Sequence, residues 1–212
     1  MSQLDFIHRF DEGAHETGVL RVLLLLPGTG GDENDLLPLG RALDPAAALL
    51  SVRGKVLENG NPRFFRRLAE GVFDEEDVVR RAKELAEFVK AAALEYGFSD
   101  GSVTAVGYSN GANIAGAMLL LGVATFSSAI LFRAMVPLVP ERLPKLSGRA
   151  LFISEGERDP IVSRDQAQTL TTLLRDAGAA VTLNFQGAGH ELIQSDLQSA
   201  REWLARLGEH VR

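Results

Sequence analysis

The sequence contains no cysteine. The chain therefore has no disulfide bond, no thiolate ligand for a metal ion and no cysteine nucleophile. Disulfides are typical of oxidising compartments, so their absence favours a reducing one. We expect a cytoplasmic protein.

An excess of positive charge is missing as well. The 28 aspartate and glutamate residues outnumber the 22 lysine and arginine residues, which gives a formal net charge of −6. Binding to nucleic acid or to an anionic membrane surface needs a basic patch or stripe. We therefore expect neither partner.

Long hydrophobic runs are also absent. The longest nearly apolar stretch, residues 114–126, is interrupted by Gly116 and Gly122. It is shorter than the roughly 20 residues that a membrane-spanning helix needs. At the start of the chain, Asp5 and His8 lie among the apolar residues, so no signal peptide is expected.

What the sequence does contain is typical of one globular unit. Its 212 residues are 46% hydrophobic and 24% charged, which fits a single α/β domain over residues 1–212. Short apolar runs alternate with segments of helical period, and this alternation predicts a mostly parallel, twisted sheet with helices on both faces. The expected strands are residues 19–26, 47–52, 103–106, 128–132, 149–154 and 181–185, and the expected helices are residues 34–43, 75–96, 112–117, 164–177 and 192–207.

Two further segments have a distinct pattern. Alternating residues from Phe6 to Phe10, followed by the turn Gly13–Gly18, predict an antiparallel edge hairpin that leads into the strand at 19–26. Residues 53–73 are expected to form a long connection at the rim of the sheet, where ligands bind in such folds.

The segment Gly107–Gly111 reads Gly-Tyr-Ser-Asn-Gly and lies between a β-branched run and a run of small residues. Strand, G-x-S-x-G turn and helix are the parts of a nucleophile elbow, in which the turn exposes the serine hydroxyl. The helix that follows offers free amides and the positive end of its dipole to an oxyanion. Ser109 is therefore the candidate nucleophile, with a plain structural turn as the alternative.

A serine nucleophile needs a base, and the chain offers four histidines. His8 falls in the edge strand, His15 in the hairpin turn and His210 at the C-terminus. His190, in contrast, ends a loop directly after a strand predicted to be buried. We predict that His190 is the base.

The carboxylate that orients this histidine should follow the preceding strand. Glu155, Glu157 and Asp159 all compete for this role. Pro160 forces an extended backbone on Asp159, whose short side chain suits a tight loop. We therefore favour Asp159 over the two glutamates.

The order of these residues along the chain is informative. Ser109, Asp159 and His190 follow one another in the order found in α/β-hydrolases, which predicts that fold. In such a fold, the amide of Asn110 and an amide of the loop after the first central strand form the oxyanion hole. We expect Thr29 to supply the second amide.

Four stretches of sequence carry a family resemblance. They are residues 25–38 (Leu-Leu-Pro-Gly-Thr-Gly-Gly-Asp-Glu-Asn-Asp-Leu-Leu-Pro), 53–55 (Arg-Gly-Lys), 107–113 (Gly-Tyr-Ser-Asn-Gly-Ala-Asn) and 187–190 (Gly-Ala-Gly-His). With them, nearly the whole chain resembles the phospholipase/carboxylesterase family of α/β-hydrolases, which includes acyl-protein thioesterases, and especially its bacterial branch linked to hydroquinone resistance. The resemblance implies a small enzyme without a large lid domain, often a homodimer, that needs no metal and no cofactor. Pro27 departs from the histidine that is usual in the family, and it lacks an amide donor.

The expected function is that of a serine hydrolase that cleaves small to medium carboxylic esters or thioesters through an acyl-enzyme. Phe64, Phe65 and Met135 are expected to wall an acyl or aryl pocket, with core packing under the long connection as the alternative. Lysophospholipase, acyl-protein thioesterase, peptidase and lactone hydrolase activities use the same catalytic residues and stay open. A non-catalytic ligand-binding protein on the same fold is the alternative from another class.

Overall fold

The computed structural model of the protein describes residues 4–13 and 20–209. Its main sheet consists of β1 (His8–Asp11), β2 (Val22–Leu26), β3 (Ala48–Val52), β8 (Val103–Tyr108), β9 (Ser128–Phe132), β10 (Ala150–Gly156) and β11 (Ala180–Gln186). The strand order is β1-β3-β2-β8-β9-β10-β11, and only β1 runs antiparallel to its neighbour. The mostly parallel sheet predicted from the sequence is confirmed.

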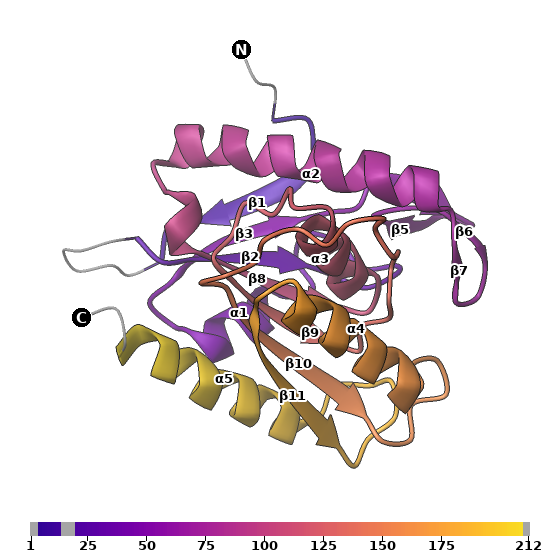
Figure 1. Ribbon diagram of the computed structural model, residues 1–212. Helices are drawn as coiled ribbons and strands as arrows, with labels where there is room; N and C mark the ends of the chain where they lie inside the picture. Colours follow the sequence, from indigo (N-terminus) through magenta and orange to yellow (C-terminus); the bar gives the residue numbers. More distant parts are fainter. Residues whose placement is uncertain (1–3, 14–19, 210–212) are drawn as a thin grey trace.

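Helices cover both faces of this sheet (Figure 1). The helices are α1 (Leu37–Leu43), α2 (Glu75–Tyr96), α3 (Asn110–Leu120), α4 (Arg164–Asp176) and α5 (Gln194–Glu209), with a short 3-10 turn, η1 (Asp100–Ser102), before β8. Buried residues of α2, α3 and α4 share one core cluster, whereas α1 and α5 pack on the opposite face. There the rings of Trp203 in α5 and Phe152 in β10 lie 5.7 Å apart.

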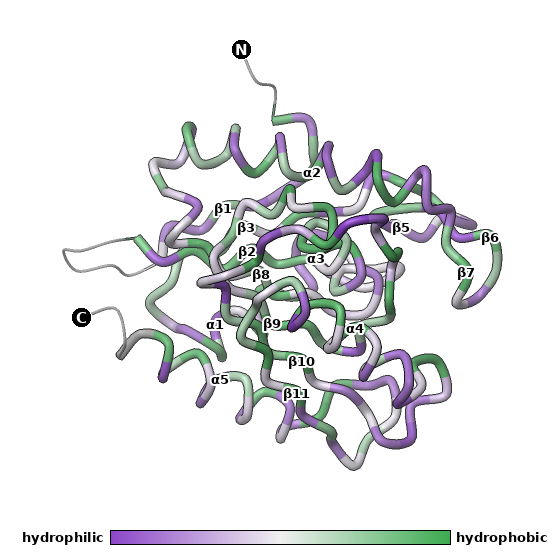
Figure 2. The backbone as a smooth tube through the Cα atoms, in the orientation of Figure 1, coloured by the Kyte–Doolittle hydropathy of each residue, from purple (hydrophilic) through white to green (hydrophobic). Residues whose placement is uncertain are grey.

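The apolar side chains follow this layered arrangement. Every residue of β2, β3 and β9 is buried, as expected for parallel strands that are covered on both faces. In Figure 2 the central strands are mostly green, whereas α2 alternates between green and purple along its length. Such alternation is typical of a helix with one face on the core and the other in solvent.

The N-terminal strand is placed differently from the sequence prediction. β1 is an antiparallel edge strand, as expected, but it pairs with β3, with His8 opposite Val52. It does not form a hairpin with β2, because both edges of β2 are taken by β3 and β8. Residues 14–18 of the predicted turn lie outside the described residues.

The connection after β3 contains two small hairpins. β4 (Val56–Glu58) pairs with β5 (Asn61–Arg63), and β6 (Arg67–Ala69) pairs with β7 (Val72–Phe73), both antiparallel. Both hairpins lie on the side toward which the carboxyl ends of the sheet strands point (Figure 1). The long connection predicted at the rim of the sheet therefore contains regular strands.

The ends of the helices are set by local chemistry. The Asp74 carboxylate accepts a hydrogen bond from the amide of Asp77 at 3.1 Å, and α2 ends where Gly97 adopts a φ of 73°. These bounds match the helix expected at residues 75–96. α1 is shorter than the expected helix at 34–43, because Pro38 occupies its first turn, where the missing amide costs nothing.

Candidate active site

Ser109 lies at a sharp turn between β8 and α3. Its backbone adopts φ 51° and ψ −113°, a strained conformation for a residue with a side chain. A Cβ atom at Gly111 would lie 1.8 Å from the Leu26 carbonyl oxygen, and one at Gly107 would lie 2.6 Å from Ala112. Both positions therefore need glycine, because backbone segments approach each other closely on both sides of the serine.

The structure brings the three predicted residues together. His190 Nε2 lies 2.9 Å from the Ser109 hydroxyl oxygen, and His190 Nδ1 lies 2.8 Å from Asp159 Oδ2. Ser109 follows β8, Asp159 follows β10 and His190 follows β11. All three lie at the carboxyl ends of parallel strands, which is where α/β folds place their ligands.

Asp159 is the carboxylate that contacts the histidine. Its side chain is fully buried, and its second oxygen, Oδ1, accepts the amides of Ile161 at 2.8 Å and Val162 at 3.1 Å. These two bonds fix the carboxylate so that Oδ2 faces His190. Of its rivals, Glu157 is an exposed residue whose carboxylate lies 3.5 Å from Arg164.

The other rival, Glu155, is buried in β10 and points elsewhere. Its Oε1 accepts the amide of Ala134 at 2.7 Å, and its Oε2 is buried without a hydrogen-bond partner. Burial raises the pKa of Glu155 well above its ordinary value, and the nearby carboxylates of Asp159 and Asp196 act in the same direction. The Ala134 amide and the charge of Arg133 oppose this rise but do not cancel it.

The two predicted oxyanion donors lie at one cavity. Thr29 and Asn110 both line it together with Ser109. Asn110 is the first residue of α3, where amides have no acceptor within the helix. Each residue is also held by its side chain, since Thr29 Oγ1 accepts from Arg63 Nη1 and Asn110 Oδ1 accepts the Phe64 amide, both at 2.7 Å.

The cavity over Ser109 has a volume of about 300 Å³. Its apolar lining includes Phe73, Met135 and Ile161, and its charged lining consists of Arg63, Arg67 and Glu70. Several of these residues belong to the two hairpins, so the long connection does reach the cavity. Among the predicted wall residues, Met135 lies where it was expected.

Phe64 and Phe65 do not line the cavity, which corrects the prediction. Both rings are buried in the core cluster beneath α2, with 3% and 0% exposure. The bond between the Phe64 amide and Asn110 fixes the backbone here, and the Phe65 ring packs against Phe73 at 5.1 Å. The sequence reading missed Phe73 because no pattern separates it from the core residues around it.

The chain matches the dienelactone hydrolase family over residues 54–205. It belongs to that family. MhqD of Bacillus subtilis (strain 168), a protein classed as a hydrolase, is 48% identical over 196 residues, which cover 92% of this chain and 96% of MhqD. Sequence, nucleophile turn and fold thus agree on an α/β-hydrolase.

Two solved carboxylesterases are also similar. The enzyme from Bacillus cereus is 47% identical, with a TM-score of 0.91 and coverage of 95% of this chain and 94% of that one. The enzyme from Mesorhizobium loti is 31% identical, with a TM-score of 0.86 and coverage of 94% of both chains. The expected resemblance to carboxylesterases is confirmed, and the relatives support hydrolase activity of this type.

Two further findings concern only residues 4–13 and 20–209. None of the helices described there combines the length and apolar character needed to cross a bilayer. The same residues contain no group of three or more histidine and carboxylate side chains placed to hold a metal ion.

Phe65→Ala is expected to act on stability and not on substrate choice. The free energy of unfolding should fall by about 3–5 kcal/mol, because a fully buried ring is removed. Urea unfolding measures this loss, with Leu57→Ala on an exposed strand as a control that should stay within about 0.5 kcal/mol. An altered preference between acetate and longer esters at unchanged stability would return Phe65 to the substrate pocket.

Glu155→Gln should change how stability depends on pH. The raised pKa means that the folded protein holds this proton more tightly than the unfolded chain, so wild-type stability is lost as pH rises from the ordinary glutamate range through the raised pKa. Glutamine keeps the acceptor for Ala134 and needs no proton, so this loss should be absent. Melting temperatures of both proteins between about pH 5 and pH 9 measure the effect, and a constant difference would contradict it.

Proposed function

We propose that the protein is a carboxylesterase that works through an acyl-enzyme on Ser109. The observation that carries this proposal is the continuous hydrogen-bonded chain from Asp159 through His190 to Ser109, beside a cavity. Nucleophile, base and orienting carboxylate in this geometry are the parts of a serine-hydrolase triad. Family membership and the carboxylesterase relatives support the same reaction class.

In the first half-reaction, the Ser109 oxygen attacks the substrate carbonyl while His190 Nε2 accepts its proton. Asp159 holds the imidazole through Nδ1–H and stabilises the positive charge that forms. The protonated His190 then gives the proton to the leaving alcohol or thiol, which departs and leaves the acyl group on Ser109. A water molecule releases the acid by the same steps, again with His190 as base.

The negative charge on the carbonyl oxygen needs donors that are already in place. We assign this role to the amides of Asn110 and Thr29, two residues that line the cavity together with Ser109. Each such donor contributes on the order of 3 kcal/mol to the stabilisation of the transition state. The side-chain bonds that Thr29 and Asn110 make to the neighbouring hairpin segment keep these amides in place before substrate arrives.

The cavity favours small or medium substrates. A volume of about 300 Å³ lies at the lower end of the range for ligand pockets. Its lining mixes Phe73, Met135 and Ile161 with charged side chains, which suits an ester or thioester with a short acyl or aryl group better than a long lipid chain. A homodimer and the single-domain organisation stay predictions.

A non-catalytic ligand-binding protein is the rival function. Such a protein would have no use for a strained serine in hydrogen-bond contact with a histidine that is itself held by a buried carboxylate. The strain at Ser109 argues for a function in which its hydroxyl reacts, because strained residues of this kind cluster at active sites.

Ser109→Ala tests the nucleophile. The variant should fold normally, and kcat for a short p-nitrophenyl ester should fall by about 10⁶-fold, because no other group can form the acyl-enzyme. The measurement is kcat of the wild type and of the variant, and equal melting temperatures of the two proteins show that the variant is folded. Substantial turnover by the folded variant would remove Ser109 from the mechanism and favour the ligand-binding alternative.

Asp159→Asn tests the orienting carboxylate. The amide cannot stabilise protonated His190 and favours the wrong tautomer, so kcat should fall by about 10⁴-fold. Glu157→Gln, two residues away and exposed, is the matched control and should keep near wild-type activity. If Glu157→Gln were the more damaging change, the assignment of Asp159 would be wrong.

A further inference from the structure

Arg133 is a fully buried arginine directly after β9, with an exposed fraction of 0%. Its backbone adopts a φ of 56°, a left-handed conformation that is uncommon for a residue with a side chain. A charged side chain is rarely buried so completely unless it is paired. The burial of the charge and the unusual backbone both indicate that the guanidinium group makes contacts that stabilise it here.

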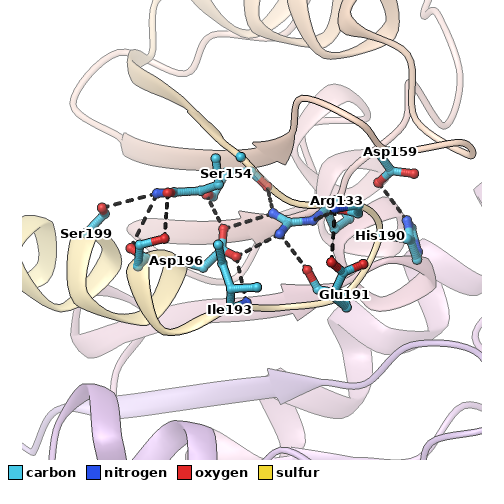
Figure 3. A network of polar contacts seen from close by, with 12 residues as sticks. Arg133, Ser154, Asp159, His190, Glu191, Ile193, Asp196 and Ser199 are labelled. Atoms are coloured by element: carbon cyan, nitrogen blue, oxygen red, sulfur yellow. Dashed lines mark hydrogen bonds and ion pairs between the residues drawn. The ribbon is translucent and has the colours of Figure 1, made fainter.

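The guanidinium group makes five hydrogen bonds, as many as it has N–H donors (Figure 3). Two go to the carboxylate of Asp196, from Nη1 to Oδ1 at 2.9 Å and from Nη2 to Oδ2 at 2.7 Å. One goes to the carbonyl of Ser154 at 3.1 Å. This paired, two-bond geometry requires arginine and cannot be reproduced by lysine.

The remaining two bonds reach the loop that carries the histidine. Nε donates to the carbonyl of Gly189 at 3.0 Å, and Nη2 donates to the carbonyl of Glu191 at 2.7 Å. These are the residues on either side of His190. Arg133 therefore holds the backbone at both ends of the residue that must stay within reach of Ser109 and Asp159.

Asp196 fixes the far side of the guanidinium group. Its Oδ1 accepts the Ser154 hydroxyl at 2.6 Å, and its Oδ2 accepts the amide of Ile193 at 3.0 Å. Burial alone lowers the pKa of Arg133, but the bonds to Asp196 and nearby negative charges raise it above its ordinary value. Burial raises the pKa of Asp196, but the bonds from Arg133, Ser154 and Ile193 together lower it. The pair is thus charged, and it ties the histidine loop to β10 and to the first turn of α5.

We propose that Arg133, held by Asp196, is a positioning residue for His190 in the proposed esterase reaction. It touches neither substrate nor reacting atoms. It acts by fixing the backbone on both sides of the histidine, so that the imidazole meets Ser109 and Asp159 at hydrogen-bond distance. This inference rests on the proposed function, since it gives His190 its role as base.

The test compares Arg133→Lys with Arg149→Lys. Arg149 is the matched control, because it also donates to loop carbonyls, those of Ala124 and Phe126, but it precedes β10 at the end of the sheet opposite the site. For Arg133→Lys we expect kcat to fall by about 10- to 100-fold with KM within about twofold, since a misplaced base slows the chemistry without weakening binding. Arg149→Lys should keep wild-type kcat, whatever its melting temperature.

An NMR measurement separates positioning from stability. The proton that His190 shares with Asp159 gives a resonance far downfield of other protons, and in Arg133→Lys it should broaden or shift while it stays unchanged in Arg149→Lys. Ser154→Ala, which removes only the hydroxyl that supports Asp196, is a milder second variant. It should lower kcat less than Arg133→Lys does, again without a change in KM.

Two results would overturn the positioning role of Arg133, and one parallel assay separates it from the proposed function. A reduced melting temperature with wild-type kcat and an unchanged His190 resonance in Arg133→Lys would overturn the proposal and leave a structural role only. If Arg133→Lys does not fold, wild-type kcat in Ser154→Ala overturns it instead. Ser109→Ala assayed in parallel keeps the two claims apart, because turnover by that variant contradicts the proposed function and not merely the role of Arg133.

Discussion

The close contact between the backbones of Gly111 and Leu26 is the constraint on which the rest of the site depends. It lets the first turn of α3 rest directly against the end of β2, with no side chain between them. Leu26 leads into the loop that carries Thr29, and Gly111 follows Asn110. The same contact that forces glycine at one position therefore brings both proposed oxyanion donors to the cavity over Ser109, where fixed amides stabilise charge without reorganisation.

Around this contact, buried polar side chains hold the loops of the site in place. Asn113 Oδ1 accepts the amide of Met135 at 2.8 Å, and Glu155 accepts the neighbouring amide of Ala134 at 2.7 Å. Arg133 holds the histidine loop in the same manner. Hydrogen bonds are strong in a low-dielectric interior and costly to break, so loops fixed in this way are rigid. Such rigidity is what a site needs when a displacement of about 1 Å can slow a reaction 100-fold.

Much of the fold and the centre of the site could be predicted from the sequence. The strands and most helices follow from apolar runs and helical periods, because a covered parallel sheet leaves a strong pattern. Ser109, Asp159 and His190 could be placed because each follows a strand, and parallel strands bring their carboxyl ends to one edge. The contact between these three residues follows from the strand topology, which the order of strands and helices along the chain already implied.

The remaining features depend on contacts between segments far apart in the chain. Phe64 and Phe65 look like exposed aromatics between arginines, but the Phe64 amide bonds to Asn110 and the Arg66 amide bonds to Asp77, and these distant contacts turn the segment inward. Arg133 gives no signal in the sequence, since its five acceptors come from three separate segments. The pairing of β1 with β3 could not be predicted either. It depends on which strand has an unpaired edge in the folded sheet, and β2 is already paired with β3 and β8.

Direct observation of the acyl-enzyme tests the account most directly. The purified protein would be mixed with a short p-nitrophenyl ester, quenched in acid within the first turnovers, digested and analysed by mass spectrometry. We predict one acyl group per chain, on the peptide that contains Ser109. Product release without any acylated peptide, or an acyl group on another residue, would contradict the mechanism.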